Sequence, residues 1–208
     1  MPVTVNEDKV WFDETRKLEQ ICNQVSVTHE NSRSVLVLSH FESTLASLTT
    51  LLESRGIAYE RFSSLNPAEL CSGAPGKVWC AAARGFRVSS EIPLATQGNT
   101  FEIIVTEHHP MHSRDQELVD AAAKLPCQAQ LTFYFSLDDP VMKHFGTDHI
   151  KALFERLGID KDECISHQLI NNAMRTAQQK IEREVGKDVT THSAMDWFKY
   201  NLPEKKKY

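Results

Sequence analysis

The chain has 208 residues, of which 41% are hydrophobic and 25% are charged, the composition of an ordinary soluble globular protein. Its net charge of −5 argues against a general nucleic-acid-binding protein, which would present a basic face. No apolar run is long enough to span a membrane, and the first residues lack the apolar core of a signal peptide. These features predict a cytoplasmic protein with one substantial domain and an appendage, or with two small domains.

The cysteines are odd in number and include no Cys-x-x-Cys spacing. This pattern is typical of reduced, mostly buried thiols in a cytoplasmic protein. A catalytic cysteine is the less favoured alternative, because it would need a nearby histidine and a lowered thiol pKa. The cysteines are Cys22, Cys71, Cys80, Cys127 and Cys164.

Predicted strands and helices alternate in the first two thirds of the chain. Residues 1–11 are expected to be an irregular lead-in, and Asp13 can cap a helix that runs to about residue 27. Residues 34–39 are apolar on both faces and therefore suit a central parallel strand. The elements predicted next are a helix over 42–55 that Gly56 ends, a strand over 58–62, a short helix from 66 to 73 and a strand over 77–81.

Glycine and proline interrupt the pattern over residues 82–100, which we predict as mostly loop with an edge strand near 88–92. A strand over 101–106 and a helix over 113–124 follow. The stretch 130–139 begins with apolar side chains that alternate with polar ones, which predicts a strand with one buried face. The alternation of strands and helices favours a parallel sheet that is covered on both faces and has right-handed crossovers.

After residue 139 only helices are predicted. They cover residues 141–145, 148–157, 163–185 and 189–200. In the third of them, apolar side chains recur every four residues on an otherwise polar helix, so this stripe must pack on something. We therefore divide the chain into an α/β domain over residues 1–139 and an all-helical extension over residues 140–208.

Two apolar surfaces are candidates for binding a partner protein. The stripe of helix 163–185 either folds back on the α/β domain or docks on another chain, including a second copy of this one. Aromatic residues near both ends of the chain, such as Trp11 and Trp197, favour packing between the first and last helices, with an exposed aromatic patch as the alternative. The candidate partner-binding residues are Ile165, Leu169, Met174, Ile181, Trp197 and Phe198.

His108, His109 and His112 form a local cluster that suggests a metal site. Adjacent histidines after a strand point in different directions, however, and no cysteine or acidic residue has ligand spacing with them. We therefore predict no metal site.

Several segments, in consistent order along the chain, resemble SecA, the ATP-driven motor of bacterial preprotein translocation. They are Arg33-Ser-Val-Leu-Val-Leu-Ser, residues 51–57, Thr106-Glu-His-His, Phe133-Tyr-Phe-Ser-Leu-Asp-Asp, Met142, Phe145-Gly, Phe154-Glu-Arg-Leu-Gly, the spaced residues Ile165, His167 and Leu169, and Ala177-Gln-Gln-Lys. The similarity covers roughly residues 10–200, which is far more specific than a single motif. It implies an α/β fold with a RecA-like parallel sheet flanked by helices, the second such domain of a helicase-type motor, followed by the start of the helical scaffold.

The phosphate-binding loop of the first motor domain has no counterpart in the sequence. The nearest string runs from Gly73 to Val78, but Val78 stands where a serine or threonine must hold magnesium. Cys71 stands where the leading glycine should be. A turn before the next strand explains this string better.

The resemblance also implies where arginines should stabilise charge on the γ-phosphate, in a glutamine-x-x-glycine-arginine-x-glycine-arginine motif. A gap-free comparison places Glu117 at the glutamine, Asp120-Ala121 at the first glycine-arginine pair and Ala123-Lys124 at the second. Every arginine of the motif is gone, and a lysine would offer a point charge without the forked donors.

A second family motif, alanine-glycine-arginine-glycine-threonine-aspartate, is also incomplete. Residues 84–89 occupy its place, where Gly85 fits and Arg84 and Arg87 are displaced. The resemblance therefore implies only vestigial nucleotide-binding residues, namely Gly85, Arg87, Asp115 and Lys124.

The expected function is that of a non-catalytic SecA-like protein that binds or regulates another protein in preprotein translocation. The partner would be SecA itself, another secretion component or a second copy of the chain. No catalytic residue and no cofactor is predicted, ATP binding is not expected, and peripheral contact with a membrane stays open. The alternative is a residual nucleotide-binding half-motor that completes an ATPase site in trans with a separate phosphate-loop protein.

Overall fold

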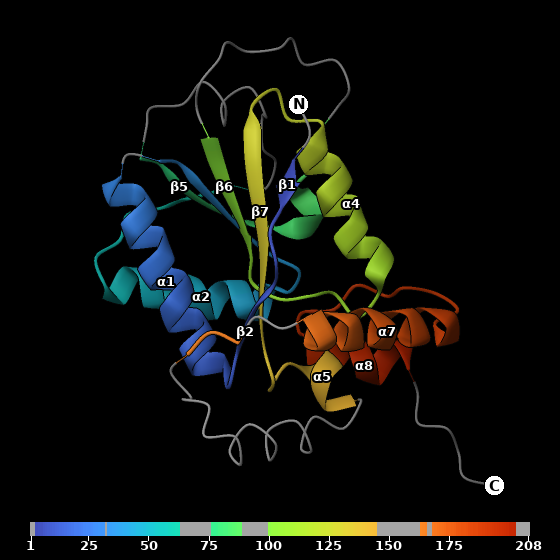
Figure 1. Ribbon diagram of the computed structural model, residues 1–208. Helices are drawn as coiled ribbons and strands as arrows, with labels where there is room; N and C mark the ends of the chain where they lie inside the picture. Colours follow the sequence, from blue (N-terminus) through green and yellow to red (C-terminus); the bar gives the residue numbers. More distant parts are fainter. Residues whose placement is uncertain are drawn as a thin grey trace, which may run out of the picture.

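A parallel sheet of seven strands forms the centre of the protein (Figure 1). The computed structural model describes residues 3–31, 33–62, 76–88, 100–144, 163–165 and 168–202. The strand order is β1-β7-β6-β3-β5-β4, and β2 pairs with β7 as well; all of these pairings are parallel. The strands are β1 (Thr4–Val5), β2 (Lys9–Trp11), β3 (Val35–Ser39), β4 (Glu60–Arg61), β5 (Val78–Ala82), β6 (Thr100–Val105) and β7 (Gln128–Ser136).

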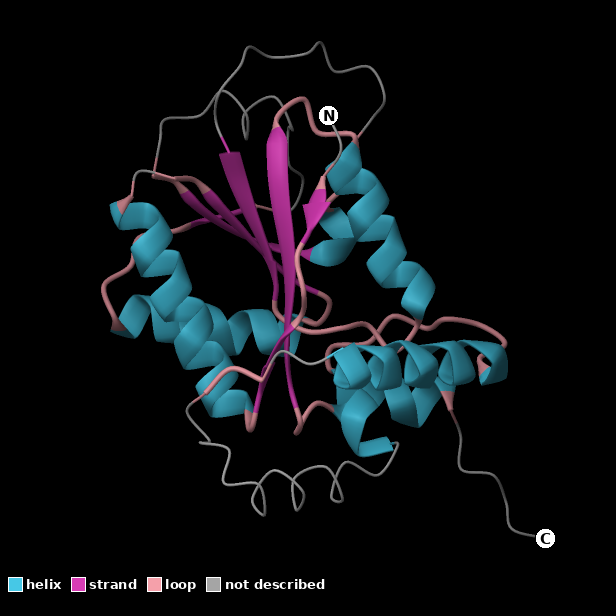
Figure 2. Ribbon diagram, viewed as in Figure 1, coloured by secondary structure: helices cyan, strands magenta, loops and turns pink. Residues whose placement is uncertain are grey.

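Helices flank the sheet on both sides and gather beyond the carboxyl end of β7 (Figure 2). They are α1 (Glu14–Glu30), α2 (Glu42–Ser54), α4 (His112–Ala123), α5 (Pro140–His144), α7 (Gln168–Glu184) and α8 (Ala194–Asn201), with a short 3-10 helix η1 (Ala83–Gly85). Asp13 caps α1 by accepting the Arg16 N–H at 2.8 Å, and α2 ends before Gly56, whose φ of 69° favours glycine. This arrangement confirms the predicted α/β class and the order of strands and helices from β3 to β7.

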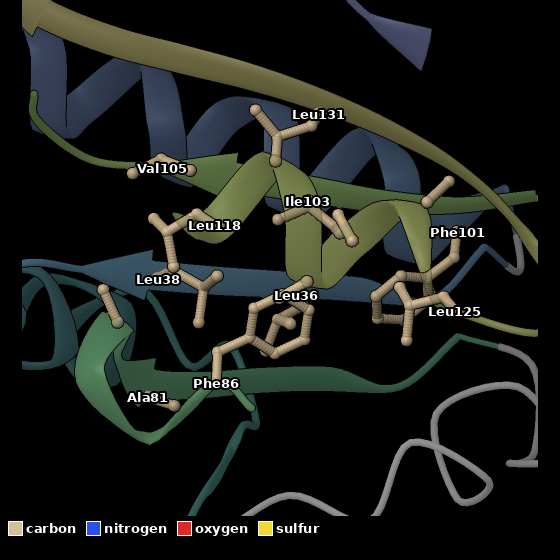
Figure 3. Packing of buried hydrophobic residues seen from close by; sticks show 14 of the residues in the cluster. Leu36, Leu38, Ala81, Phe86, Phe101, Ile103, Val105, Leu118, Leu125 and Leu131 are labelled. Atoms are coloured by element: carbon tan, nitrogen blue, oxygen red, sulfur yellow. The ribbon is translucent and has the colours of Figure 1, made fainter. Parts of the chain in front are cut away.

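The two faces of β3 belong to two different cores. Val35 and Val37 pack with α1 and α2 on one face, whereas Leu36 and Leu38 pack with α4 on the other. Figure 3 shows this second core, in which Leu118 of α4 lies over the strands. A strand that is apolar on both faces is buried on both, which is why the sequence marks β3 as central.

A third core joins the helical extension to the α/β domain. Phe135 and Leu137, at the end of β7, pack against α5, α7 and α8. Val10 of β2 and Phe41 belong to the same cluster. The apolar stripe of α7 therefore folds back on this chain, and the helices predicted after residue 139 share their core with the sheet.

The structure differs from the sequence-based expectation at the N-terminus and at the start of α7. Residues 3–11 are not an irregular lead-in, because β1 and β2 both add to the free edge of β7. The helix α7 begins at Gln168, since Ile165 instead exchanges backbone hydrogen bonds with Val10 at 2.9 and 3.2 Å. The helices predicted at 66–73 and 148–157, and most of the edge strand predicted at 88–92, lie outside the described residues.

Among the cysteines, Cys22 and Cys80 are buried, Cys127 is half-buried and Cys164 is exposed. Burial raises the pKa of the Cys22 thiol to about 11 and that of Cys80 to about 12. Both buried thiols are therefore protonated at neutral pH and unreactive.

In the parts of the chain that the structure describes, no helix has the length and apolarity needed to cross a membrane.

A buried ion pair ties α1 to the exit of β7. Lys17 is only 1% exposed, and its Nζ donates to Asp139 Oδ1 at 2.9 Å. The Ser136 hydroxyl donates to the same oxygen at 2.7 Å. Burial alone would lower the pKa of Lys17, but Asp139 and then Glu107 outweigh it and raise this pKa, so the ammonium stays charged.

We predict that Lys17→Met lowers the free energy of unfolding by about 3–5 kcal/mol, because it leaves the Asp139 carboxylate buried without its cation. Urea unfolding of the purified variant measures this loss. The matched control is Lys77→Met, which breaks an exposed pair with Glu60 and should leave the unfolding midpoint unchanged. Equal midpoints for both variants would contradict the structural role of the buried pair.

Candidate functional site

Between β3 and β6, the direction in which successive strands are added to the sheet reverses. From β3 the chain adds β4 and β5 on one side, and β6 then pairs with the other side of β3. In parallel α/β sheets, ligands bind outside the carboxyl ends of the strands at such a point. His40 follows β3, and Glu107, His108 and His109 follow β6. These residues, with Asp115 of α4 and Gln178 of α7, are called the carboxyl-edge cluster below.

Asp115 is the centre of this cluster. Its Oδ1 lies 2.8 Å from His40 Nε2 and accepts the backbone N–H of His109 at 3.0 Å. Its Oδ2 lies 2.7 Å from His108 Nδ1 and accepts from Gln178 Nε2 at 2.6 Å. One buried carboxylate therefore joins the ends of two strands, the first turn of α4 and the middle of α7.

The cluster holds its charges inside the protein. Burial alone would raise the pKa of Asp115, but His108 and then His40 outweigh it and hold this pKa well below its usual range. Burial alone would lower the pKa of His108, but Asp115 and then Asp8 raise it to about 10. At neutral pH, His108 is therefore an imidazolium between two carboxylates, with Asp8 Oδ2 at 3.3 Å from its Nε2.

His109 behaves differently from its neighbour. Burial and then the nearby His40 lower the pKa of His109 to about 3, so its ring is neutral. Its Nδ1 accepts the backbone N–H of Met111 at 3.0 Å. The ring also stacks on Phe41, with 5.7 Å between ring centroids.

Glu107 binds the backbone just before α2. Its Oε1 accepts the backbone N–H of His40 at 2.6 Å and that of Phe41 at 3.1 Å. Free N–H groups at a helix N-terminus are a common binding site for phosphate or carboxylate. In the first turn of α2, the Ser43 N–H donates to the carbonyl of His192 at 3.1 Å, and burial raises the pKa of the Glu107 carboxyl group.

The helical extension closes the cluster from the outside. The Gln178 side chain donates to the carbonyl of His109 at 2.7 Å as well as to Asp115. Trp197 of α8 lies edge-on to His109, and its Nε1 donates to Asp188 Oδ1 at 2.7 Å. The other oxygen of Asp188 accepts from Arg114 Nε at 2.8 Å. Polar and aromatic contacts together therefore hold α7 and α8 over the carboxyl edge of the sheet.

A cleft of about 260 Å³ lies beside the cluster, between η1, the start of α4 and residues 188–191. Arg84 and Arg87 reach its rim. Arg84 pairs with Glu42 at 3.1 Å, and Arg87 pairs with Glu117 at 3.3 Å. Glu117 also accepts from Arg114 at 2.9 Å. The positive charges of the cleft are therefore matched by acidic groups of the same chain.

The structure brings together only part of the predicted nucleotide site. Asp115 lies in the cluster, Arg87 lies at the cleft, and Gly85 ends η1 and lines a neighbouring hollow with Arg84. Lys124 caps the far end of α4. Because a helix rises about 1.5 Å per residue, Lys124 lies about 15 Å along the axis from Arg114, near the opposite edge of the sheet. Lys124 therefore does not join the other three residues.

The histidines that suggested a metal centre are used otherwise. His108 and His109 are bound within the cluster, and His112 opens α4. In the described ranges, no group of three or more histidine, cysteine or acidic residues is placed to hold a metal ion.

The residues proposed for partner binding are for the most part inside the protein. Met174, Ile181 and Trp197 are almost fully buried, and Ile165 is also buried, all in the core that joins the extension to the sheet. These four are therefore packing residues of this chain, since the apolar face of α7 needs the end of β7 to bury it. Phe198 is half-buried against the same core, and the Leu169 side chain lies outside the described residues.

Sequence reasoning missed half of the cluster. His40 and Glu107 could have been found, because each directly follows a predicted strand, where the carboxyl ends of parallel strands meet. Gln178, and Asp8 beside the cluster, gave no local signal. They meet Asp115 and His108 across 63 and 100 residues of sequence, respectively.

Ala121, at the first arginine position of the family motif, packs in the core. Ala121 is 7% exposed and lies with Ala122 and Leu118 in the core between α4 and the sheet. Ala121→Arg should therefore lower the free energy of unfolding by about 3 kcal/mol, because the core has no room for the side chain and no partner for its charge. The control is Lys124→Arg at the exposed end of α4, which we expect to be neutral. Urea unfolding measures the free energy of unfolding of both variants. An Ala121→Arg variant as stable as the wild type would show that this position faces solvent.

The charges of the cluster predict a pH dependence of stability. A group whose pKa is raised by folding contributes stability below its unfolded pKa and loses it as pH rises towards its folded pKa. For His108 this range runs from about 6.5 to about 10. Between pH 7 and 8, before the thiols titrate, His108 stays protonated in the folded protein but loses its proton in the unfolded chain. The free energy of unfolding should therefore fall by about 1 kcal/mol per pH unit.

Asp115→Asn should flatten this slope, because His108 loses its main carboxylate partner. Denaturant unfolding at several pH values measures the slope, and an NMR titration of His108 measures its pKa directly. Asp120→Asn, an exposed change on the same helix, is the control and should keep the slope. A wild-type slope in the Asp115→Asn variant would contradict the assigned charges.

No family model matches the chain. It is similar to the protein translocase subunit SecA of Caldicellulosiruptor saccharolyticus, with 31% identity over 183 residues, which cover 84% of this chain and 22% of that protein. SecA of Campylobacter concisus is 30% identical over 183 residues, which cover 84% of this chain and 21% of that protein. SecA of Clostridium tetani is 29% identical over 185 residues, which cover 85% of this chain and 22% of that protein. The chain thus spans about a fifth of the length of these relatives.

Two solved structures resemble the protein at low sequence identity. The C-terminal part of the Fun30 ATPase domain has a TM-score of 0.44 and 12% identity, with 80% of this chain and 54% of that chain covered. The C-terminal domain of a possible DNA helicase from a Lactobacillus has a TM-score of 0.40 and 10% identity, with 65% and 73% covered. Over 84% of its own length, this α/β protein is therefore similar to about a fifth of the translocase subunit SecA.

Proposed function

We propose that this protein is a non-catalytic relative of SecA that acts by binding another protein of preprotein translocation, with SecA itself as the first candidate. Its relatives are named as protein translocase subunits, which supports a role in that process. The chain corresponds to about a fifth of their length. Its incomplete nucleotide motifs favour a role as a binding or regulatory module.

The observation that carries this proposal is the closed state of the carboxyl edge. Four groups of the chain itself surround the Asp115 carboxylate, and Glu107 accepts the N–H groups of His40 and Phe41 just before α2. Catalysis of phosphoryl transfer depends on positioned cations and donors that face the phosphates. At this edge the donors already serve acidic groups of the protein, which argues against a working nucleotide site.

The motif positions on α4 support the same conclusion. Glu117, at the position of the family glutamine, forms ion pairs with Arg87 and Arg114. Ala121, at an arginine position, is buried in the core against the sheet. Neither Ala121 nor Lys124, at the two arginine positions of the motif, offers a guanidinium group, so these positions of α4 supply no forked donor to a transferred phosphoryl group.

A residual nucleotide-binding half-motor remains the second candidate, because of the cleft beside the cluster. The side chains of Arg84 and Arg87 are 62% and 65% exposed at its rim. Exposed guanidinium groups can leave their acidic partners and bind phosphate. A separate phosphate-loop protein would then have to supply the rest of the site.

Titration calorimetry with ATP and magnesium, together with a hydrolysis assay, separates the two candidates. We expect neither saturable heat nor turnover above background. Micromolar binding that is lost in an Arg84→Ala, Arg87→Ala double variant would instead establish the half-motor.

The partner is tested separately by surface plasmon resonance with purified SecA, before and after addition of ATP to SecA. The proposal predicts saturable binding to SecA. Two results together would reject a role in preprotein translocation. They are the absence of a surface plasmon resonance signal with SecA and the failure of affinity capture to recover any secretion component.

A further inference from the structure

The outer edge of β1 is open to an additional strand. The Asn6 N–H donates to the carbonyl of Leu131 in β7 at 2.8 Å. Because successive peptide groups of a strand point to opposite sides, the N–H and C=O of Val5 point away from β7. In the portion of the chain that the structure describes, no strand pairs with β1 on that side, and Val5 is 47% exposed.

At the neighbouring strand β2, the outward backbone groups are hydrogen-bonded to another segment of the chain. The corresponding backbone groups of Val10 are both bonded to Ile165, at 2.9 and 3.2 Å. This antiparallel bridge satisfies the outward backbone groups of β2 at Val10. Among the described residues, no such partner is present at the adjoining edge of β1.

A groove of about 410 Å³ lies beside Val5, between residues 5–8, α4 and α7. Four amide side chains line its helical walls, Gln116 from α4 and Asn171, Asn172 and Gln178 from α7. Val119 adds an apolar surface. We call this hollow the amide groove.

The chemistry of the amide groove matches a peptide backbone. An amide side chain both donates and accepts hydrogen bonds, as each peptide group does. The Asn171 Oδ1 atom is buried and accepts no hydrogen bond from the described residues. A buried acceptor without a partner costs free energy, which an N–H group of a ligand would recover.

The charges in the groove argue against a purely anionic or cationic ligand. Glu7, Asp8 and Asp115 contribute carboxylates, whereas His108 and Arg175 contribute positive charge. A neutral chain of alternating donors and acceptors is compatible with this mixture, and the open edge of β1 requires the same chemistry.

We propose that the β1 edge and the amide groove bind an extended strand of a partner protein by adding it to the sheet. Main-chain hydrogen bonds to Val5 supply affinity, and the amides on α7 hold the outer side of the strand. This inference rests on the proposed function as a binding module and specifies the form of its partner.

The test uses a short fluorescein-labelled peptide of alternating threonine and valine, with a lysine at each end, and fluorescence anisotropy with the full chain. The control peptide has proline at every second position, which removes the donors that a strand needs. We expect the first peptide to bind and the second to bind at least about tenfold more weakly. Equal affinities would overturn the proposal.

Variants of the protein locate the binding surface. Val5→Pro removes the outward N–H and should weaken binding about tenfold, whereas Val5→Thr keeps this N–H and should not. Asn171→Ala with Asn172→Ala should also weaken binding, whereas Gln179→Ala, an exposed amide elsewhere on α7, should not. Circular dichroism and urea unfolding confirm that each variant is folded.

Two results would reject the proposal without deciding the proposed function. One is unchanged peptide affinity in both the Val5→Pro and the Asn171→Ala, Asn172→Ala variants. The other is sedimentation of the free protein as a dimer that Val5→Pro dissociates, which would make a second copy the occupant of the edge. Binding to SecA that survives in these variants would retain the proposed function and place its surface elsewhere.

Discussion

The buried carboxylate of Asp115 is the interaction on which the rest of the structure depends. It joins the ends of β3 and β6, the start of α4 and, through Gln178, the helical extension. A buried charge is tolerated only when it is paired and hydrogen-bonded, and here His108 supplies the positive charge. The same contacts that neutralise Asp115 therefore also fix the extension on the sheet.

This closure bears directly on function. RecA-like motors work across a cleft, where one domain presents cationic groups to a nucleotide held by another. In this protein, the carboxyl edge of the sheet is filled by Glu107, by the cluster and by Trp197 of α8. This edge is therefore an internal contact between the sheet and the extension.

The sequence predicted the elements that carry their own pattern. β3 is apolar on both faces, α1 has Asp13 as its cap, and β7 alternates, so each could be assigned locally. β1 and β2 have two and three residues, too few for any period, and exist only because β7 has a free edge. The site was only partly predictable for the same reason, since Gln178 reaches Asp115 through the tertiary fold.

Hydrogen–deuterium exchange with and without ATP and magnesium tests the closed carboxyl edge most directly. The backbone amides from His40 to Phe41 and from Glu107 to Asp115, and those of α7, are the reporters. We predict slow exchange that ATP leaves unchanged, because these groups are already satisfied within the chain. Fast exchange at the edge in the free protein, with protection gained on addition of ATP, would contradict the closed edge and show that it is a nucleotide site.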